Sequence, residues 1–151
     1  MNQNPYDMWQ RALATGCSRE RNGILWKLIR RVDCPEGILL DICQKFPDMQ
    51  DQFIWRASIP DSVCRILCQG SHYLKTQLAC REDTPEDVLI KLSDTHFLDV
   101  VWNNNCPSSV LVEAIQNHKH VPYEFSIHRN MPCGYWMFGV WRYDTEIDVR
   151  S

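Results

Sequence analysis

The chain has 151 residues, of which 44% are hydrophobic and 23% are charged, and its formal net charge is -3 at pH 7. This length fits one domain with a continuous core, and the composition is not that of a disordered chain. The slight acidic excess argues against a dedicated nucleic-acid-binding protein, which would carry a strong positive bias.

The first thirty residues are expected to form two helices. The apolar spacing predicts helices over residues 6–14 and 18–31, and the second carries Ile24, Leu25 and Leu28 on one face. We interpret these two helices as an N-terminal cap for the segment that follows.

The N-terminal decapeptide MNQNPYDMWQ is polar and lacks the basic and apolar segments of a secretion signal. No apolar run reaches the length needed to span a membrane. We therefore expect a cytoplasmic protein without membrane association. The eight cysteines are expected to be free thiols, because disulfide frameworks belong mostly to shorter secreted chains.

From Cys34 onward, one short motif recurs, with proline in its second place and an apolar pair in its last two places. Successive prolines of the motif are 25, 25, 22 and 25 residues apart, so the short interval acts as a three-residue deletion. Such a regular spacing indicates internal repeats. The copies are Cys34–Leu39, Ile59–Cys64, Thr84–Leu89 and Cys106–Leu111, with a weaker fifth start at Met131–Pro132.

Each motif is expected to begin a helix. Proline suits the first helical turn because its missing N–H would have no partner there, and acidic or serine residues after it favour the positive helix end. Apolar residues recur at the third, fourth and seventh positions after each proline, which is one face of a helix. These residues are Ile38, Leu39, Ile42, Val63, Cys64, Leu67, Val88, Leu89, Leu92, Val110, Leu111 and Ala114.

A second apolar pair follows in each sequence repeat and is expected to form the other wall of that repeat. A polar stretch then leads to the next proline, so each repeat reads as helix, connector, short second element and turn. One such repeat cannot bury both faces alone, so neighbouring repeats are expected to stack into a superhelix. The pairs are Phe53 and Trp55, Leu78 and Cys80, Val100 and Trp102, and Phe125 and Ile127.

The run from Thr84 to Leu92 and its three counterparts resemble the variant leucine-rich repeat family over about residues 31–132. The resemblance implies an all-α, right-handed solenoid in which an α-helix alternates with a short 3-10 helix. HEAT-like helical pairs are the nearest alternative, although their period is longer. We expect four to five repeats of 22–25 residues in a single domain, 1–151, with a helical cap (1–30), repeats (31–132) and an aromatic C-terminal cap and tail (133–151).

Metal binding by the cysteines deserves consideration, because Cys64 and Cys68 are four residues apart and some members of the resembled family are associated with an iron–sulfur cluster. However, six of the eight cysteines fall at equivalent positions of the repeats, where small apolar residues replace one another. No CxxC pair accompanies them. We therefore expect buried structural thiols, no metal site and no cofactor.

Catalysis has no positive support in the sequence. His72 and His96 fall in connectors and are expected in solvated turns, and the His118–His120 cluster is expected in an exposed polar loop. Glycine-rich phosphate loops, paired carboxylates with a histidine, and a GxSxG elbow are all absent. We expect no enzymatic activity and no catalytic residues.

The candidate binding surface is a polar ladder, Arg56, Arg81, Asn103 and His128, at equivalent positions of the repeats. Stacked repeats project such positions along one edge, where they form a recognition surface or stay solvated. The aromatic segment with Trp136, Phe138 and Trp141 either closes the core or meets a partner. The predicted partner-binding residues are Arg56, Arg81, Asn103, His128, Trp136 and Trp141.

The leading functional hypothesis is a protein-binding solenoid, and within that class a bacterial immunity or inhibitor protein that neutralises a toxin by direct binding. A compact, mildly acidic domain without catalytic residues suits a stoichiometric blocker of a basic toxin or nuclease, because complementary charge speeds encounter. The alternatives are nucleic-acid binding along Arg56, Arg81 and His128, and an iron–sulfur or zinc protein that uses the cysteines.

Overall fold

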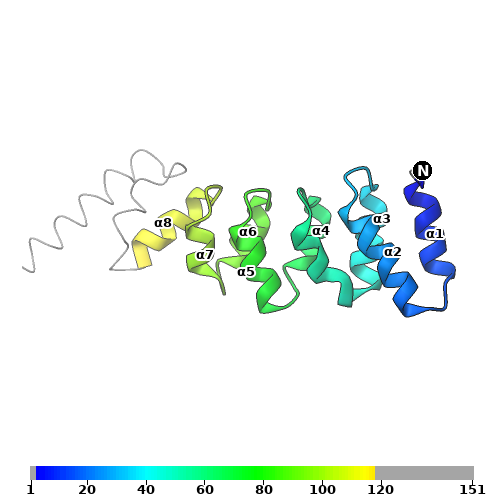
Figure 1. Cartoon of the computed structure of the whole chain (residues 1–151). Helices are drawn as coiled ribbons and strands as arrows, with labels where there is room; N and C mark the ends of the chain where they lie inside the picture. Colours follow the sequence, from blue (N-terminus) through cyan, green and yellow to red (C-terminus); the bar gives the residue numbers. More distant parts are fainter. Residues whose placement is uncertain (1–2, 118–151) are drawn as a thin grey trace, which may run out of the picture. The chain divides into compact units, whose positions relative to one another are not determined.

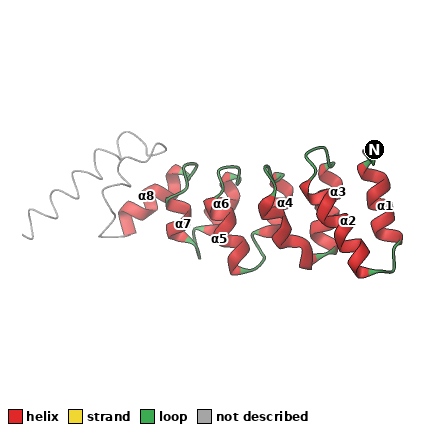
Figure 2. Ribbon diagram, viewed as in Figure 1, coloured by secondary structure: helices red, strands yellow, loops and turns green. Residues whose placement is uncertain are grey.

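The computed structural model describes residues 3–117, and within them every regular element is a helix (Figures 1 and 2). No helix in this part of the chain is long and apolar enough to cross a membrane. His128, Trp136 and Trp141, together with the fifth motif and the 133–151 segment, lie outside the described residues.

Two compact units make up the chain: an N-terminal unit, Met1–Leu78, and a C-terminal unit, Ala79–Ser151. The boundary falls inside helix α5 (His72–Cys80), so it coincides with none of the turns that separate the sequence repeats. The single domain that we expect over 1–151 therefore stays a prediction.

The two expected N-terminal helices are present as α1 (Pro5–Ala14) and α2 (Ser18–Arg30), which pack against each other in the N-terminal unit (Figure 1). Asn4 Oδ1 accepts a hydrogen bond of 3.0 Å from Tyr6 N and so caps α1. At the other end of α1, Arg11 donates to Glu20 at 2.8 Å and Thr15 Oγ1 donates to the other carboxylate oxygen of Glu20 at 3.0 Å. These bonds lower the pKa of Glu20.

Helix α1 carries the same apolar spacing as the later repeats. Met8, Trp9 and Ala12 stand at the third, fourth and seventh positions after Pro5, and all three are buried. The interval from Pro5 to Pro35 is longer than the intervals between the later prolines, which hid this motif from the sequence analysis. The cap is thus built like the repeats that follow it.

Each of the four motif prolines within residues 3–117 is followed directly by a helix, as predicted. The proline is the N-cap residue rather than the first helical residue, and its carbonyl accepts the first helical hydrogen bonds, as from Leu39 N at 3.2 Å and from Cys64 N at 3.0 Å. All twelve predicted inward residues of these helices are buried. The helices are α3 (Glu36–Lys45), α4 (Asp61–Leu67), α6 (Glu86–Leu92) and α8 (Ser108–Asn117).

The second elements are η1 (Pro47–Trp55), α5 and α7 (Phe97–Val101), and only η1 is a 3-10 helix. The alternation of α and 3-10 helices that the resemblance implies thus occurs once in the described residues. At the start of η1, Met49 N bonds to Phe46 O three residues back. At the start of α5, Lys75 N bonds to Ser71 O four residues back, and the Ser71 hydroxyl caps Leu74 N, which favours an α-helical turn.

In each of the three described pairs of the predicted second wall, one residue is buried and the other is exposed; the fourth pair, Phe125 and Ile127, lies outside the described residues. Phe53, Leu78 and Val100 are buried as expected, whereas Trp55 is 64% exposed, Trp102 is 56% exposed and Cys80 is also exposed. In a helix, residues i and i+2 point to nearly opposite sides, so only a strand would bury both. The buried neighbours are the intervening residues, Ile54, Ala79 and Val101.

Substitutions in η1 test this register. Phe53→Ala removes a fully buried ring and is expected to lower the free energy of unfolding by about 3–5 kcal/mol, because it leaves a cavity. The neighbouring control, Trp55→Ala, is expected to change it by less than about 1 kcal/mol, because Trp55 is exposed. Urea titration followed by circular dichroism measures both values, and a larger loss for Trp55→Ala would contradict this register.

Candidate interaction surface

Arg56, the first member of the polar ladder, joins two elements of the N-terminal unit. It follows η1, and its Nη1 atom donates to the carbonyl oxygens of Ile29 at 2.6 Å and Arg31 at 2.5 Å. Both carbonyls lie at the C-terminal end of α2, where a helix leaves its last carbonyl groups without intrahelical partners. Arg56 therefore ties the end of η1 to the end of α2.

Asn103 makes the same connection in the C-terminal unit. Its Nδ2 atom donates to the carbonyl oxygens of Ala79 at 2.6 Å and Arg81 at 2.8 Å, at the C-terminal end of α5. Its Oδ1 atom accepts a hydrogen bond from Asn105 N at 2.8 Å. Asn103 is only 4% exposed, so this shorter side chain replaces the arginine in a buried connection.

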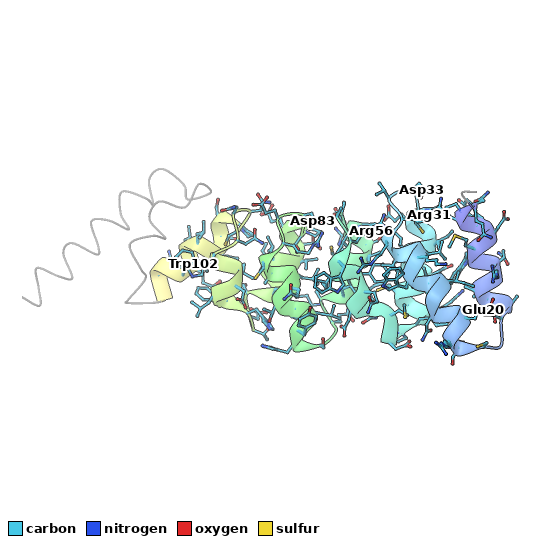
Figure 3. The ribbon with its side chains drawn as sticks, viewed as in Figure 1. Glu20, Arg31, Asp33, Arg56, Asp83 and Trp102 are labelled. Atoms are coloured by element: carbon cyan, nitrogen blue, oxygen red, sulfur yellow. The ribbon has the colours of Figure 1, made fainter. Side chains whose placement is uncertain are left out.

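Arg31 and Arg81 each pair with an aspartate two residues further on. Arg31 binds Asp33 through two nitrogens at 2.8 and 2.5 Å, and Arg81 binds Asp83 in the same way at 2.7 and 2.8 Å. Figure 3 shows Arg31 and Asp33 side by side. The hydrogen bonds from Arg31 hold the pKa of Asp33 below its ordinary value. The sequence analysis missed Arg31, because it lies at the border of the assumed cap.

The ladder side chains are thus engaged inside the protein. Arg56, Arg81 and Asn103 bond to main-chain oxygens or to an aspartate, and Asn103 offers almost no surface. A partner-binding role for these three residues stays a prediction, and their observed role is to connect elements. The ladder member His128 lies outside the described residues.

The exposed surface beside the ladder belongs to aromatic residues that the sequence analysis did not single out. Trp55 and Trp102 each precede a ladder residue by one position. In the N-terminal unit, α2 packs against η1 and adds Trp26, which is 43% exposed and has the guanidinium carbon of Arg30 at 4.6 Å from its ring centroid. Helical periodicity could have predicted these exposed residues, because in a helix the residue that follows two buried neighbours points outward.

The described cysteines are buried as expected, with two exceptions, Cys17 and Cys80, which are exposed. Cys34, Cys43, Cys64, Cys68 and Cys106 are buried, whereas Cys80 is exposed, although its position was predicted to be a buried one. Cys80 follows the inward residue Ala79 and so turns outward like Trp55. Burial raises the pKa of Cys34 to about 11 and of Cys43 and Cys106 to about 12.

Cys64 and Cys68, the candidate metal pair, have separate main-chain partners. Cys64 Sγ lies 3.8 Å from Ile59 O, and Cys68 Sγ lies 3.1 Å from Arg65 O. Within residues 3–117, no three side chains of histidine, cysteine, aspartate or glutamate are grouped to hold a metal ion. The Cys133 thiol lies outside the described residues.

The two described histidines differ from each other. His72 is the first residue of α5 and is exposed, as predicted. His96, predicted in a solvated turn, is only 6% exposed, and its Nδ1 atom lies 2.8 Å from Thr95 Oγ1. When the three-residue deletion is allowed for, His96 aligns with Met49 and Leu74 of the preceding repeats, which are also buried. Its position therefore belongs to the core and not to the connector.

The described surface offers exposed aromatic side chains and polar edges. Burial raises the pKa of Cys34, Cys43 and Cys106, which keeps these thiols protonated at neutral pH and makes them poor nucleophiles. The chain matches no protein-family model, no curated protein and no solved structure.

The buried ladder connection can be tested with a pair of neighbouring asparagines. Asn103→Ala leaves two main-chain carbonyls without their donor and is expected to lower the free energy of unfolding by about 2–3 kcal/mol. Asn104→Ala, at an exposed residue, is the control and is expected to cost about 0.5 kcal/mol or less. Equal effects in thermal and urea unfolding would show that the connection adds no stability.

Thiol labelling tests the assignment of the cysteines. In the folded protein, iodoacetamide is expected to modify Cys17 and Cys80 first, because both are exposed. Cys43 and Cys106 are expected to stay unmodified even near pH 9, because a pKa of about 12 keeps them protonated and burial blocks access. Peptide mass spectrometry with and without urea reads out each site. Early labelling of Cys43 would contradict its burial.

Proposed function

We propose that the protein is a non-enzymatic, protein-binding helical solenoid similar to the variant leucine-rich repeat family. The stacking of its sequence repeats is supported by a connection that occurs in both compact units. Arg56 in the N-terminal unit and Asn103 in the C-terminal unit occupy equivalent positions, and each donates to two carbonyls at the end of an earlier second element. A connection that recurs at equivalent positions is what a repeat array needs.

Protein binding is supported chiefly by the exposure of tryptophan at an equivalent position in each unit. Trp55 is 64% exposed and Trp102 is 56% exposed, although tryptophan is among the most apolar and bulky side chains. Leaving such rings in water forgoes about 1.5–3 kcal/mol of burial each. Tryptophan is also enriched at the centres of protein interfaces, where it supplies much of the binding energy.

Within this class, we propose a bacterial cytoplasmic immunity or inhibitor protein that neutralises a basic toxin or nuclease by direct binding. The charge of the chain supports this choice. Between residues 79 and 117 there are seven acidic residues and only two basic ones, Arg81 and Lys91. Such an excess of negative charge attracts a basic protein and excludes acidic competitors.

The two alternative functions have less support. Nucleic-acid binding along Arg56, Arg81 and His128 would need free guanidinium groups, but Arg56 donates to main-chain carbonyls and Arg81 pairs with Asp83. An iron–sulfur or zinc site would need several thiols in one place. The described buried cysteines instead have separate main-chain partners, as seen for Cys34, Cys64 and Cys68.

Co-expression with the products of the neighbouring genes tests this function. A one-to-one complex is expected in size-exclusion chromatography with light scattering, because an inhibitor binds its target stoichiometrically. Trp55→Ala or Trp102→Ala is expected to weaken the complex by about thirtyfold, as for a residue at the centre of an interface.

Tyr6→Ala serves as the matched control, because Tyr6 is an equally exposed aromatic residue on α1. It is expected to leave the affinity unchanged. A protein that stays monomeric with every neighbouring gene product, or a complex that tolerates both tryptophan substitutions, would contradict the proposal.

A further inference from the structure

A hollow lies on the C-terminal unit where the first turn of α6 meets the segment before α8. It has a volume of about 280 Å³ and is lined by Glu86, Asn105, Cys106, Pro107 and Ser108. Asn105 is held in place there, because its main-chain N–H donates to Asn103 Oδ1 and its side-chain amide donates to the carbonyl oxygen of Glu82. The walls of this hollow are therefore fixed by the buried ladder connection.

The carboxylate of Glu86 differs from its counterpart in the N-terminal unit. Glu36 also follows a motif proline, and it accepts a hydrogen bond of 2.6 Å from the Ser62 hydroxyl in the next repeat. Ser109 takes the place of Ser62 in the C-terminal unit, but it does not bond to Glu86. Among residues 3–117, the Glu86 side chain has neither a hydrogen-bond nor an ion-pair partner.

The hollow lies in the repeat that carries the three-residue deletion. The interval between Pro85 and Pro107 is 22 residues, whereas the interval between Pro35 and Pro60 is 25 residues. The shorter repeat has a five-residue second helix, α7, in place of the nine-residue η1. The shortened repeat thus coincides with the hollow. An unpaired carboxylate is not confined to it, because Asp61, which follows Pro60 in a 25-residue repeat, also has no hydrogen-bond or ion-pair partner among residues 3–117.

The chemistry of the hollow favours a cation. Glu86 supplies a negative charge, Asn105 and Ser108 supply polar groups, and the Cys106 thiol stays neutral because burial raises its pKa to about 12. Glu82, which accepts a hydrogen bond of 2.8 Å from Asn104, adds a second carboxylate close by. With seven acidic against two basic residues over 79–117, the surrounding field is negative and repels phosphates.

An exposed apolar surface begins within a few residues of the hollow. Trp102 directly follows α7 and precedes Asn105 by three residues, and Figure 3 labels it on this unit. Leu98, one turn earlier on α7, is 65% exposed. A partner that covers α7 and reaches the hollow would therefore meet a tryptophan, a leucine and a carboxylate in one contact.

We infer that the Glu86 hollow and the adjacent Trp102 form a docking surface for a lysine or arginine side chain of a basic protein partner. This inference rests on the proposed function, because it assigns a site to the protein partner. A protein segment with one cationic and one large apolar side chain matches both parts of the surface. A nucleic acid does not match it, because its phosphates would face Glu82 and Glu86.

Selection of short random peptides displayed on phage tests the inference with the full-length chain as bait. The selected peptides are expected to be richer in lysine or arginine than the starting library and to carry a large apolar residue. Glu86→Gln is expected to weaken their binding about three- to tenfold, and Trp102→Ala about thirtyfold.

Two controls separate local from general effects. Asp94→Asn removes one exposed negative charge of the same unit outside the hollow, and Tyr6→Ala removes an exposed aromatic ring on α1 of the N-terminal unit. Both are expected to bind the selected peptides as the wild type does, with circular dichroism showing that all variants are folded.

The outcomes distinguish the site from the function. If the selected peptides bind the Asp94→Asn and Glu86→Gln variants equally weakly, the hollow is not a specific site. The proposal of protein binding would still stand in that case. Selected peptides with no excess of lysine or arginine also overturn the inference. The proposed function fails separately, when no neighbouring gene product forms a complex.

Discussion

The side chains of Arg56 and Asn103, which follow η1 and α7, bond to the main chain at the end of an earlier helix, and the rest of the structure depends on this connection. Arg56 and Asn103 each supply two hydrogen bonds to carbonyls at a helix end. These helices are short, α7 having only five residues, and helices of that length do not persist in water without tertiary support. The connection supplies donors to the helix-end carbonyls of Ile29 and Ala79, and a second donor to those of Arg31 and Arg81, which also accept from Cys34 N and Thr84 N.

Because the described ladder side chains form hydrogen bonds within the protein, other residues provide the exposed surface. Among them are the preceding residues Trp55 and Trp102. The two units differ in charge beside these rings. Helix α2 carries four basic residues and one acidic residue, whereas residues 79–117 are strongly acidic. Each unit therefore offers a tryptophan in a different electrostatic setting, which favours recognition of different features of a partner.

The sequence was sufficient to predict the helices after the motif prolines, because their inward positions follow directly from helical spacing. The predictions for the second elements were wrong, because residues two apart, such as Phe53 and Trp55, were both expected to point inward. The prediction of an exposed His96 was also wrong, because the deletion shifts this residue to a buried position. The bonds of Arg56 and Asn103 depend on how closely two helix ends approach, which spacing does not reveal. The hollow at Glu86 lies in the repeat that carries the deletion. The position of the deletion is visible in the sequence, but the packing around it is not.

Hydrogen exchange in the Arg56→Met variant tests the central connection most directly. Methionine replaces the aliphatic part of the arginine side chain but cannot donate hydrogen bonds to the two carbonyls. The account predicts that amides at both ends of η1, including those of Met49 and Arg56, exchange about tenfold faster or more, while those of α1 are unchanged. Unchanged exchange in η1 would show that the ladder bonds do not hold the elements together and would contradict the account.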